Sequence, residues 1–178
     1  MNTAKQGGDG SAVDAIALLR ADHQKVRQLF NEFDTIKDDL EQAELKAELV
    51  EQLCFELTIH TLVEEELFYP AVRAEIGDEL VDEAEAEHAS AKDLVSQLEQ
   101  MEATDTQYDA TVMVLNERVE QHLTEEESNM FPQVKKTGLD LAELGEQIAR
   151  HKEKIEADFN ATPRPGRGGG SQFKSAHP

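Results

Sequence analysis

The sequence predicts an all-α protein, an antiparallel up-down four-helix bundle with a short additional C-terminal helix. Four long segments carry apolar residues at steps of three and four, which is the spacing of one helix face. No long stretch alternates apolar and polar residues with the period of two that a strand requires. Aromatic residues make up only 5% of the chain and tryptophan is absent, which favours aliphatic packing between helices.

The first predicted helix begins near Ser11, because Ser11-x-x-Asp14 has the form of a capping box. Its apolar stripe includes a histidine and consists of Ile16, Leu19, His23, Val26, Phe30 and Phe33. The second stripe includes a histidine and two glutamates: Leu49, Leu53, Glu56, His60, Glu64 and Leu67. Pro70, like Pro132 later, is expected to kink its helix or to restart it at the first position, since proline lacks a backbone N–H.

The third helix follows Gly77-Asp78, a pair typical of a helix stop and a new N-cap. Its stripe is Val81, Ala84, His88, Ala91, Val95 and Leu98. Thr106-x-x-Asp109 is expected to cap the fourth helix, whose stripe is Val112, Leu115, Val119, His122 and Glu126. A shorter fifth helix is expected from Asp140, with Leu141, Leu144, Ile148, His151 and Ile155 in step.

The two ends of the chain differ in composition from the predicted bundle. Residues 1–10 are small and polar and are expected to be flexible. Residues 11–160 are assigned to the bundle and its fifth helix. Residues 161–178 are rich in glycine and proline and carry basic but no acidic residues, so we expect a disordered basic tail.

Acidic residues dominate the composition, with 38 Asp and Glu against 17 Lys and Arg and a formal net charge of −21. This charge disfavours nucleic acid and anionic membranes as partners. The single cysteine, Cys54, allows no intrachain disulfide. The N-terminus lacks the apolar core of a signal peptide, and no run approaches the roughly 18 apolar residues of a membrane span. We therefore expect a cytoplasmic protein.

Two stretches of the sequence are near copies, HTLVEEELFYP at residues 60–70 and HLTEEESNMFP at residues 122–132. Each places a glutamate four residues after the histidine and a proline ten residues after it. Residues four apart share one helix face. Each pair can therefore aim an imidazole and a carboxylate at one point in the core, His60 with Glu64 and His122 with Glu126.

The first and third helices add His23 and His88 at matching positions, so the chain consists of two related hairpins. Packed about a pseudo-twofold axis, they predict six metal ligands in one layer: His23, His60, Glu64, His88, His122 and Glu126. Imidazole and carboxylate suit iron or manganese, although zinc could substitute. If both glutamates bridge two metals beside an oxo or hydroxo group, each metal has two histidines and one open position for a small ligand.

Other interpretations of these residues stay open. A histidine on an apolar stripe is often only a core residue with a hydrogen-bond partner, and both glutamates could face outward among acidic neighbours. Glu127 is the alternative to Glu126, which we choose because a step of five rotates about 140° away from the stripe. The acidic runs 64–66 and 125–127 are expected to be solvated surface.

Three further residues are weighed as site members. Glu56 could fill a coordination position, but an ion pair with Arg118 or Lys92 is the preferred interpretation. His151 lacks a carboxylate one turn on and is expected to be a packing or surface histidine. Cys54 is expected to be a small buried apolar group.

These residues resemble the hemerythrin-like (HHE cation-binding) family in its prokaryotic single-domain form. The resemblance rests on His23 in ADHQKVRQLF, His88 in EAEHAS and the two repeated stretches, and it covers about residues 12–135. It implies a four-helix bundle around a non-haem di-iron centre. It also implies functions in oxygen binding or sensing, iron handling, or reactions with peroxide or nitric oxide.

Two departures from the family pattern bear on function. Oxygen-carrying members have a second histidine one turn after the third-helix histidine, where this chain has Lys92. They also end in a histidine and an aspartate five residues apart, a spacing that here gives Glu127. The missing histidine leaves one open position per metal, so we expect a centre that binds, senses or reacts with oxygen, peroxide or nitric oxide. Peroxidase, catalase-like or oxidase activity is one form of this function. The alternatives are an iron-storage or iron-availability module without catalysis and a metal-free structural bundle.

Overall fold

The computed structural model describes residues 14–161, and all regular structure in this range is helical, which confirms the predicted all-α class. The expected capping role of Ser11, the segment 1–10 and all but the first residue of the tail 161–178 lie outside the described residues. Within this range no helix is both long and apolar enough to cross a membrane. The α-helices are α1 (Ala15–Ile36), α2 (Ala43–Val63), α3 (Tyr69–Ile76), α4 (Asp78–Leu98), α5 (Tyr108–Glu125), α6 (Phe131–Val134) and α7 (Leu141–Ala161).

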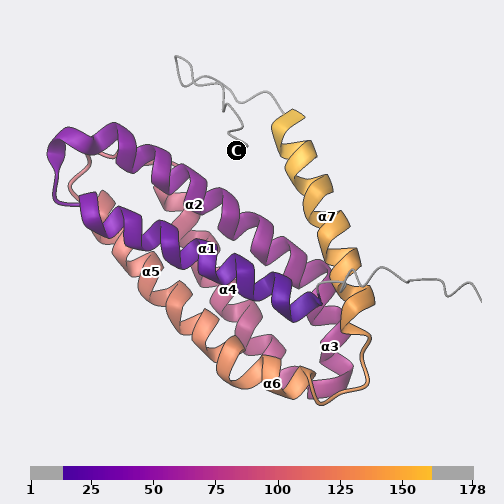
Figure 1. Ribbon diagram of the computed structural model, residues 1–178. Helices are drawn as coiled ribbons and strands as arrows, with labels where there is room; N and C mark the ends of the chain where they lie inside the picture. Colours follow the sequence, from indigo (N-terminus) through magenta and orange to yellow (C-terminus); the bar gives the residue numbers. More distant parts are fainter. Residues whose placement is uncertain (1–13, 162–178) are drawn as a thin grey trace, which may run out of the picture.

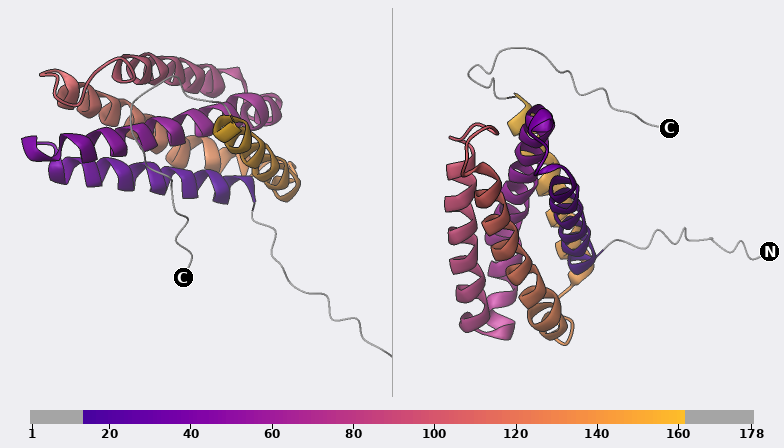
Figure 2. Two further views of the ribbon diagram at one scale, coloured as in Figure 1. Left: turned by 90° about the horizontal axis from the view of Figure 1, so that it is seen from above. Right: turned by 90° about the vertical axis from the view of Figure 1, so that its left-hand side faces the viewer.

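Four long helices lie side by side along the length of the molecule (Figure 1; Figure 2). α1 packs against α2 and α4 against α5, and a 3-10 turn, η1 (Leu40–Gln42), joins the first pair. The apolar core is divided into two clusters. Leu19 and Ile59 belong to one cluster, whereas Val26 and Leu57 belong to the other. In α1 the change from one cluster to the other falls at His23, and in α4 it falls at His88, between Ala84 and Ala91.

A side-chain cap and a glycine turn set the starts of α1 and α4. Asp14 caps α1, because its side chain accepts a hydrogen bond from the Ala17 N–H at 2.8 Å. Gly77 ends α3 with φ of +92°, a conformation that favours glycine, and α4 begins at the next residue. The expected Thr106 cap is wrong, since α5 begins at Tyr108 without a side-chain cap. Asp109 instead accepts a hydrogen bond from Nζ of the buried Lys46 at 2.9 Å.

Both repeated stretches contain a π-helical turn, η2 (Glu64–Phe68) after α2 and η3 (Glu126–Met130) after α5. In each turn the backbone bond spans five residues, because the N–H of Tyr69 donates to the Glu64 carbonyl and that of Phe131 to the Glu126 carbonyl. The prolines then stand in the first turn of α3 and α6, where no N–H is needed. The restart expected at both prolines is therefore observed, with a π turn before it.

The fifth long helix, α7, is not short, since its 21 residues equal the lengths of α2 and α4. Figure 1 shows it crossing the bundle at an angle, and it contacts both α1 and α2. In its first half, the side chains of Leu144 and Ile148 are buried. Its apolar spacing continues past Ile155 to Phe159, whose ring lies 4.4 Å from that of Phe55. The helix ends within one residue of the predicted boundary at residue 160, and only the expectation that it is short is wrong.

Candidate metal centre

The structure brings all six predicted site residues together in the layer between the two apolar clusters. Their exposed fractions are at most 5%: His23 0%, His60 2%, Glu64 0%, His88 2%, His122 5% and Glu126 1%. They form two overlapping groups, in each of which one ligand atom per residue lies within 4.8 Å of the others. The groups are His60, Glu64, His88 and His122, and His23, His60, Glu64 and Glu126. His60 and Glu64 belong to both groups.

The Nε2 atoms of the histidines face the interior of the cluster. Glu64 Oε2 lies 3.1 Å from His60 Nε2 and 3.2 Å from His88 Nε2. Glu126 Oε2 lies 3.3 Å from His23 Nε2, and the Nε2 atoms of His88 and His122 are 3.0 Å apart. Six imidazole and carboxylate side chains therefore converge on one enclosed region of the core.

The Nδ1 atoms of the same histidines face outward. Three of them lie within hydrogen-bond distance of a carboxylate, and that of His60 lies further from one. The pairs are His23 with Glu127 at 2.8 Å, His88 with Glu65 at 3.1 Å, His122 with Glu87 at 2.9 Å, and His60 with Asp22 at 3.9 Å. Metal-binding histidines almost always have such an outer partner, which fixes the ring and raises its basicity. Three of the four histidines therefore have the outer carboxylate partner that is typical of metal-binding histidines.

The four outer carboxylates obey the pseudo-twofold relation between the hairpins. Glu65 and Glu127 each directly follow a glutamate of the cluster, and Asp22 and Glu87 each directly precede a histidine. Sequence reasoning missed this role and assigned the acidic runs to solvated surface, yet Glu65 and Glu127 are only 27% and 23% exposed. The sequence does contain a hint of this role, because an acidic residue stands directly beside His23, Glu64, His88 and Glu126.

Tyr69 is a further member of the site that the sequence did not reveal. Its hydroxyl donates to Glu126 Oε1 at 3.0 Å and lies 3.3 Å from Glu64 Oε2 and from His88 Nε2. The π turn brings this hydroxyl back to the cluster from the start of α3. The equivalent position in the second repeated stretch holds Phe131, whose ring stacks on His23 with centroids 5.6 Å apart.

Burial and neighbouring charges separate the proton affinities of the two inner carboxylates. Burial, reinforced by the charge of Glu126, raises the pKa of Glu64 well above its usual range. Burial opposes ionisation of Glu126 as well, but the adjacent imidazole of His23 and the charge of His122 outweigh it and lower its pKa to about 2. Burial raises the pKa of Tyr69 well above its usual range.

Burial lowers the pKa of two of the histidines, His60 and His88, which favours the neutral form that ligates metals. Burial and the nearby His122 lower the pKa of His88 to about 2, and burial also lowers the pKa of His60. Burial would lower the pKa of His122 too, but the hydrogen bond to Glu87 and the charge of Glu126 outweigh it, so this pKa is raised.

Three residues weighed from the sequence lie outside the cluster. Glu56 pairs with Lys25 at 2.5 Å, which supports the ion-pair interpretation with a partner other than the two expected. His151 pairs with the exposed Glu66 at 2.5 Å. Cys54 is a buried free thiol, and burial raises its pKa to about 12.

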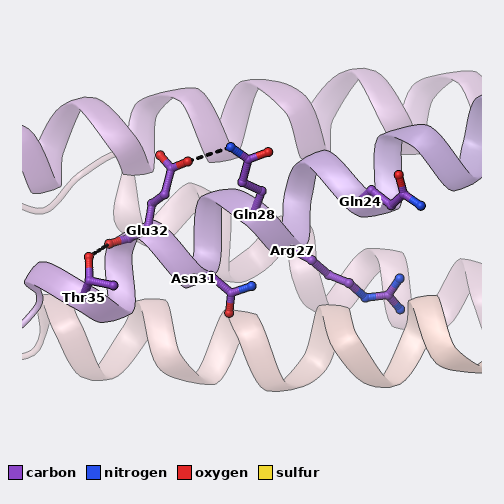
Figure 3. A pocket seen from close by; sticks show the side chains of 6 residues that line it. All are labelled: Gln24, Arg27, Gln28, Asn31, Glu32 and Thr35. Carbon is purple, nitrogen blue, oxygen red and sulfur yellow. Dashed lines mark hydrogen bonds between the residues drawn. The ribbon is translucent and has the colours of Figure 1, made fainter.

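The surface of the described residues has a depression on α1 and a cleft beside the cluster. One is a shallow depression lined only by α1 side chains, among which Gln28 donates to Glu32 at 2.8 Å (Figure 3). The other is a cleft of about 230 Å³ between α2, α4 and α5. His60, His88 and His122 line it, so it connects the cluster with the surface.

Unpaired polar atoms test whether the cluster fits a metal ion. Within residues 14–161, several fully buried atoms have no hydrogen-bond partner, among them His23 Nε2, His60 Nε2, Glu64 Oε1 and Glu126 Oε2. Leaving such an atom unpaired costs about 1–3 kcal/mol. A cation ligated by these nitrogens and oxygens removes that cost, so the donor set fits a metal.

An all-helical fold with buried histidines and glutamates facing each other across a bundle defines a metal-cation-binding class of helical protein. The model of the hemerythrin HHE cation binding domain matches residues 14–134. The chain therefore belongs to the hemerythrin HHE cation-binding family, as the resemblance predicted.

Two similar proteins extend this comparison. The crystal structure of a hemerythrin HHE cation binding domain-containing protein from Mycobacterium kansasii superposes with a TM-score of 0.69 at 28% identity, covering 85% of this chain and 95% of that one. A DNA nickase from Nostoc sp. strain PCC 7120 is 28% identical over 130 residues, which is 73% of this chain. The chain spans only 36% of the length of the Nostoc protein.

Proposed function

We propose that this chain is a non-haem di-iron protein that binds, senses or reacts with oxygen, peroxide or nitric oxide. The observation that carries the proposal is the pair of overlapping four-residue groups that share His60 and Glu64. The long helices of an antiparallel up-down bundle would hold one metal in each group. The ligands are His23, His60, Glu64, His88, His122 and Glu126. A bound pair of iron ions, bridged by an oxo or hydroxo group, supplies redox chemistry towards small ligands.

The surrounding side chains prepare the site for this role. The outer carboxylates orient the imidazoles, and the Tyr69 hydroxyl holds a proton beside Glu64, Glu126 and His88. The ring of Phe131 covers His23 and excludes water from that side. Tyr69 thus places a hydrogen-bond donor next to the two groups of candidate ligands, whereas Phe131, at the equivalent position, provides only an apolar surface.

The cleft between α2, α4 and α5 supports ligand chemistry over closed storage. Storage needs only metal exchange, whereas a reactive centre needs a path for small molecules to its open positions. The cleft reaches His60, His88 and His122 and leaves the His23 side covered. A metal-free structural bundle is disfavoured by the buried polar atoms that lack partners.

DNA nicking is not part of the proposal. The Nostoc protein named as a DNA nickase extends well beyond this chain, which spans 36% of its length. The formal net charge of −21 opposes the approach of a DNA backbone.

Elemental analysis tests the proposed function. The protein is purified without a metal-affinity tag, and its visible and near-ultraviolet spectrum is recorded before and after azide. We expect about two irons per chain and bands that azide shifts. A metal-free sample that melts at the same temperature in chelator and in added iron would overturn the proposal. Manganese or zinc in place of iron would keep the site and change its chemistry.

A further inference from the structure

The cleft beside the cluster is built in three parts. Its mouth is exposed and includes Lys92, Ser96 and Arg118. Its middle is lined by buried apolar side chains from three helices: Leu57, Ala91, Val119 and Leu123. Its floor is formed by the buried His60, His88 and His122. A molecule that enters therefore passes from water through an apolar section to the histidines.

The size of the cleft exceeds what a diatomic ligand needs. Its volume is about 230 Å³. A water molecule occupies roughly 30 Å³, and an apolar protein cavity of about 150 Å³ accommodates benzene. A path for oxygen or nitric oxide alone would not require this volume. The cleft is therefore large enough to hold a six-membered ring with one substituent.

The position of the missing histidine lies at the mouth of the cleft, where Lys92 is one of the lining residues. Lys92 stands one turn after His88, and its Nζ extends to Glu65 Oε2 at 2.6 Å. The Lys92–Glu65 pair lies at the mouth of the cleft, and the Glu65 carboxylate also lies 3.1 Å from Nδ1 of His88.

We propose that this cleft binds an organic molecule of the phenol class, with its ring in the apolar section and its oxygen facing His60, His88 and His122. The proposal rests on the proposed function, because these histidines are three of its metal ligands. Apolar walls match the two faces of a ring, and the cluster of ligand atoms at the floor matches one polar oxygen. A sugar or nucleotide would leave polar groups unpaired against the apolar walls.

The test uses 4-fluorophenol and ¹⁹F NMR on the metal-loaded, full-length chain. Ala91→Phe fills the apolar section, and we expect it to weaken binding at least tenfold. Ala89→Phe is the matched control, since Ala89 lies on the exposed face of the same helix and should leave binding unchanged. Ser96→Trp at the exposed mouth provides a second block in case Ala91→Phe folds poorly. Fluorobenzene, which lacks the oxygen, should bind several-fold more weakly than 4-fluorophenol.

The outcomes separate this proposal from the proposed function. Equal binding of 4-fluorophenol to wild type, Ala91→Phe and Ser96→Trp overturns the cleft proposal, as does no binding at all. If azide still shifts the spectrum in either case, the metal centre stands without an organic ligand. If the chain takes up no metal but binds 4-fluorophenol in a manner blocked by Ala91→Phe, the cleft stands and the proposed function fails.

Discussion

Tyr69 and Phe131 occupy equivalent positions in the two repeated stretches, and both rings lie against a histidine of the cluster. The ring centroids are 5.4 Å apart for Tyr69 and His88 and 5.6 Å apart for Phe131 and His23. Only Tyr69 carries a hydroxyl, which contacts Glu64, Glu126 and His88. The two hairpins are therefore nearly symmetric in backbone structure, but only the first places a hydroxyl beside the cluster.

Tyr69→Phe tests the role of this hydroxyl. We expect the variant to fold, because phenylalanine already fills the equivalent position in the other half. Metal affinity should fall on the order of 10–100-fold, the usual effect of losing a group that supports metal ligands. Competition with a chelator of known affinity measures the change.

Tyr108→Phe is the matched control for that experiment. Tyr108 is buried in the apolar cluster away from the metal groups. Its replacement should leave metal affinity unchanged, even if stability falls. Equal losses of affinity in the two variants would show that the effect of Tyr69→Phe is structural.

Glu126 and Glu127 are expected to differ in their response to substitution. Glu126 lies inside the cluster, whereas Glu127 contacts Nδ1 of His23 from outside and pairs with Arg27 at 2.8 Å. Glu126→Gln should lose at least one metal per chain. Glu127→Gln should retain both metals with affinity reduced by about tenfold. Metal counting on both variants checks this, and the reverse pattern would assign the ligand role to Glu127.

Lys152 on α7 is expected to influence the site through Asp22. Its Nζ lies 2.5 Å from Asp22, whose carboxylate faces His60. Burial would raise the pKa of Asp22, but the nearby His60 imidazole and the hydrogen bond from Lys152 outweigh it and lower this pKa. Lys152→Met removes this hydrogen bond, so Asp22 should support His60 less well and metal affinity should fall about tenfold.

Lys154→Met removes the same charge from an exposed position on the same helix. It should leave metal affinity unchanged. A matching loss in both variants would indicate a general charge effect of α7 and remove the specific role of Lys152.

Metal binding should raise the stability of the folded chain. The unpaired buried atoms around the cluster gain ligand bonds only in the folded state. At free metal one hundred times the dissociation constant, the gain is about 2.7 kcal/mol per site. Thermal melts with and without iron(II) under anaerobic conditions measure it. His60→Ala, which removes the histidine shared by both groups, should abolish the difference.

Cys54 should be unreactive in the folded chain. Burial raises its pKa from 9.0 to about 12, so the thiol keeps its proton at neutral pH. We expect very slow reaction with a disulfide reagent at pH 8 and rapid reaction in denaturant. Because the folded pKa is the higher one, this group favours folding below pH 9 and loses that contribution as pH rises towards 12. Fast labelling of the native protein at pH 8 would contradict the prediction.

The sequence predicted the helical class and the six residues of the cluster, because helical period and repeated spacing survive in a single chain. It did not predict the outer carboxylates, since Glu65 or Glu87 on a charged helix face has the same local pattern as a solvated acid. Tyr69 was missed for a different reason. Its approach to the cluster depends on the π turn, which changes hydrogen-bond register without changing the apolar pattern.

Each π turn is equivalent to one extra residue inserted in an α-helix. In both halves the insertion lies between the glutamate of the cluster and the aromatic residue before proline. Residues 60–70 and 122–132 consequently align without a gap, extra residue included. Duplication of a hairpin that already contained the insertion would explain both turns by one event. Later divergence of Tyr69 from Phe131 would then have placed a hydroxyl beside the cluster in one half and an apolar ring in the other.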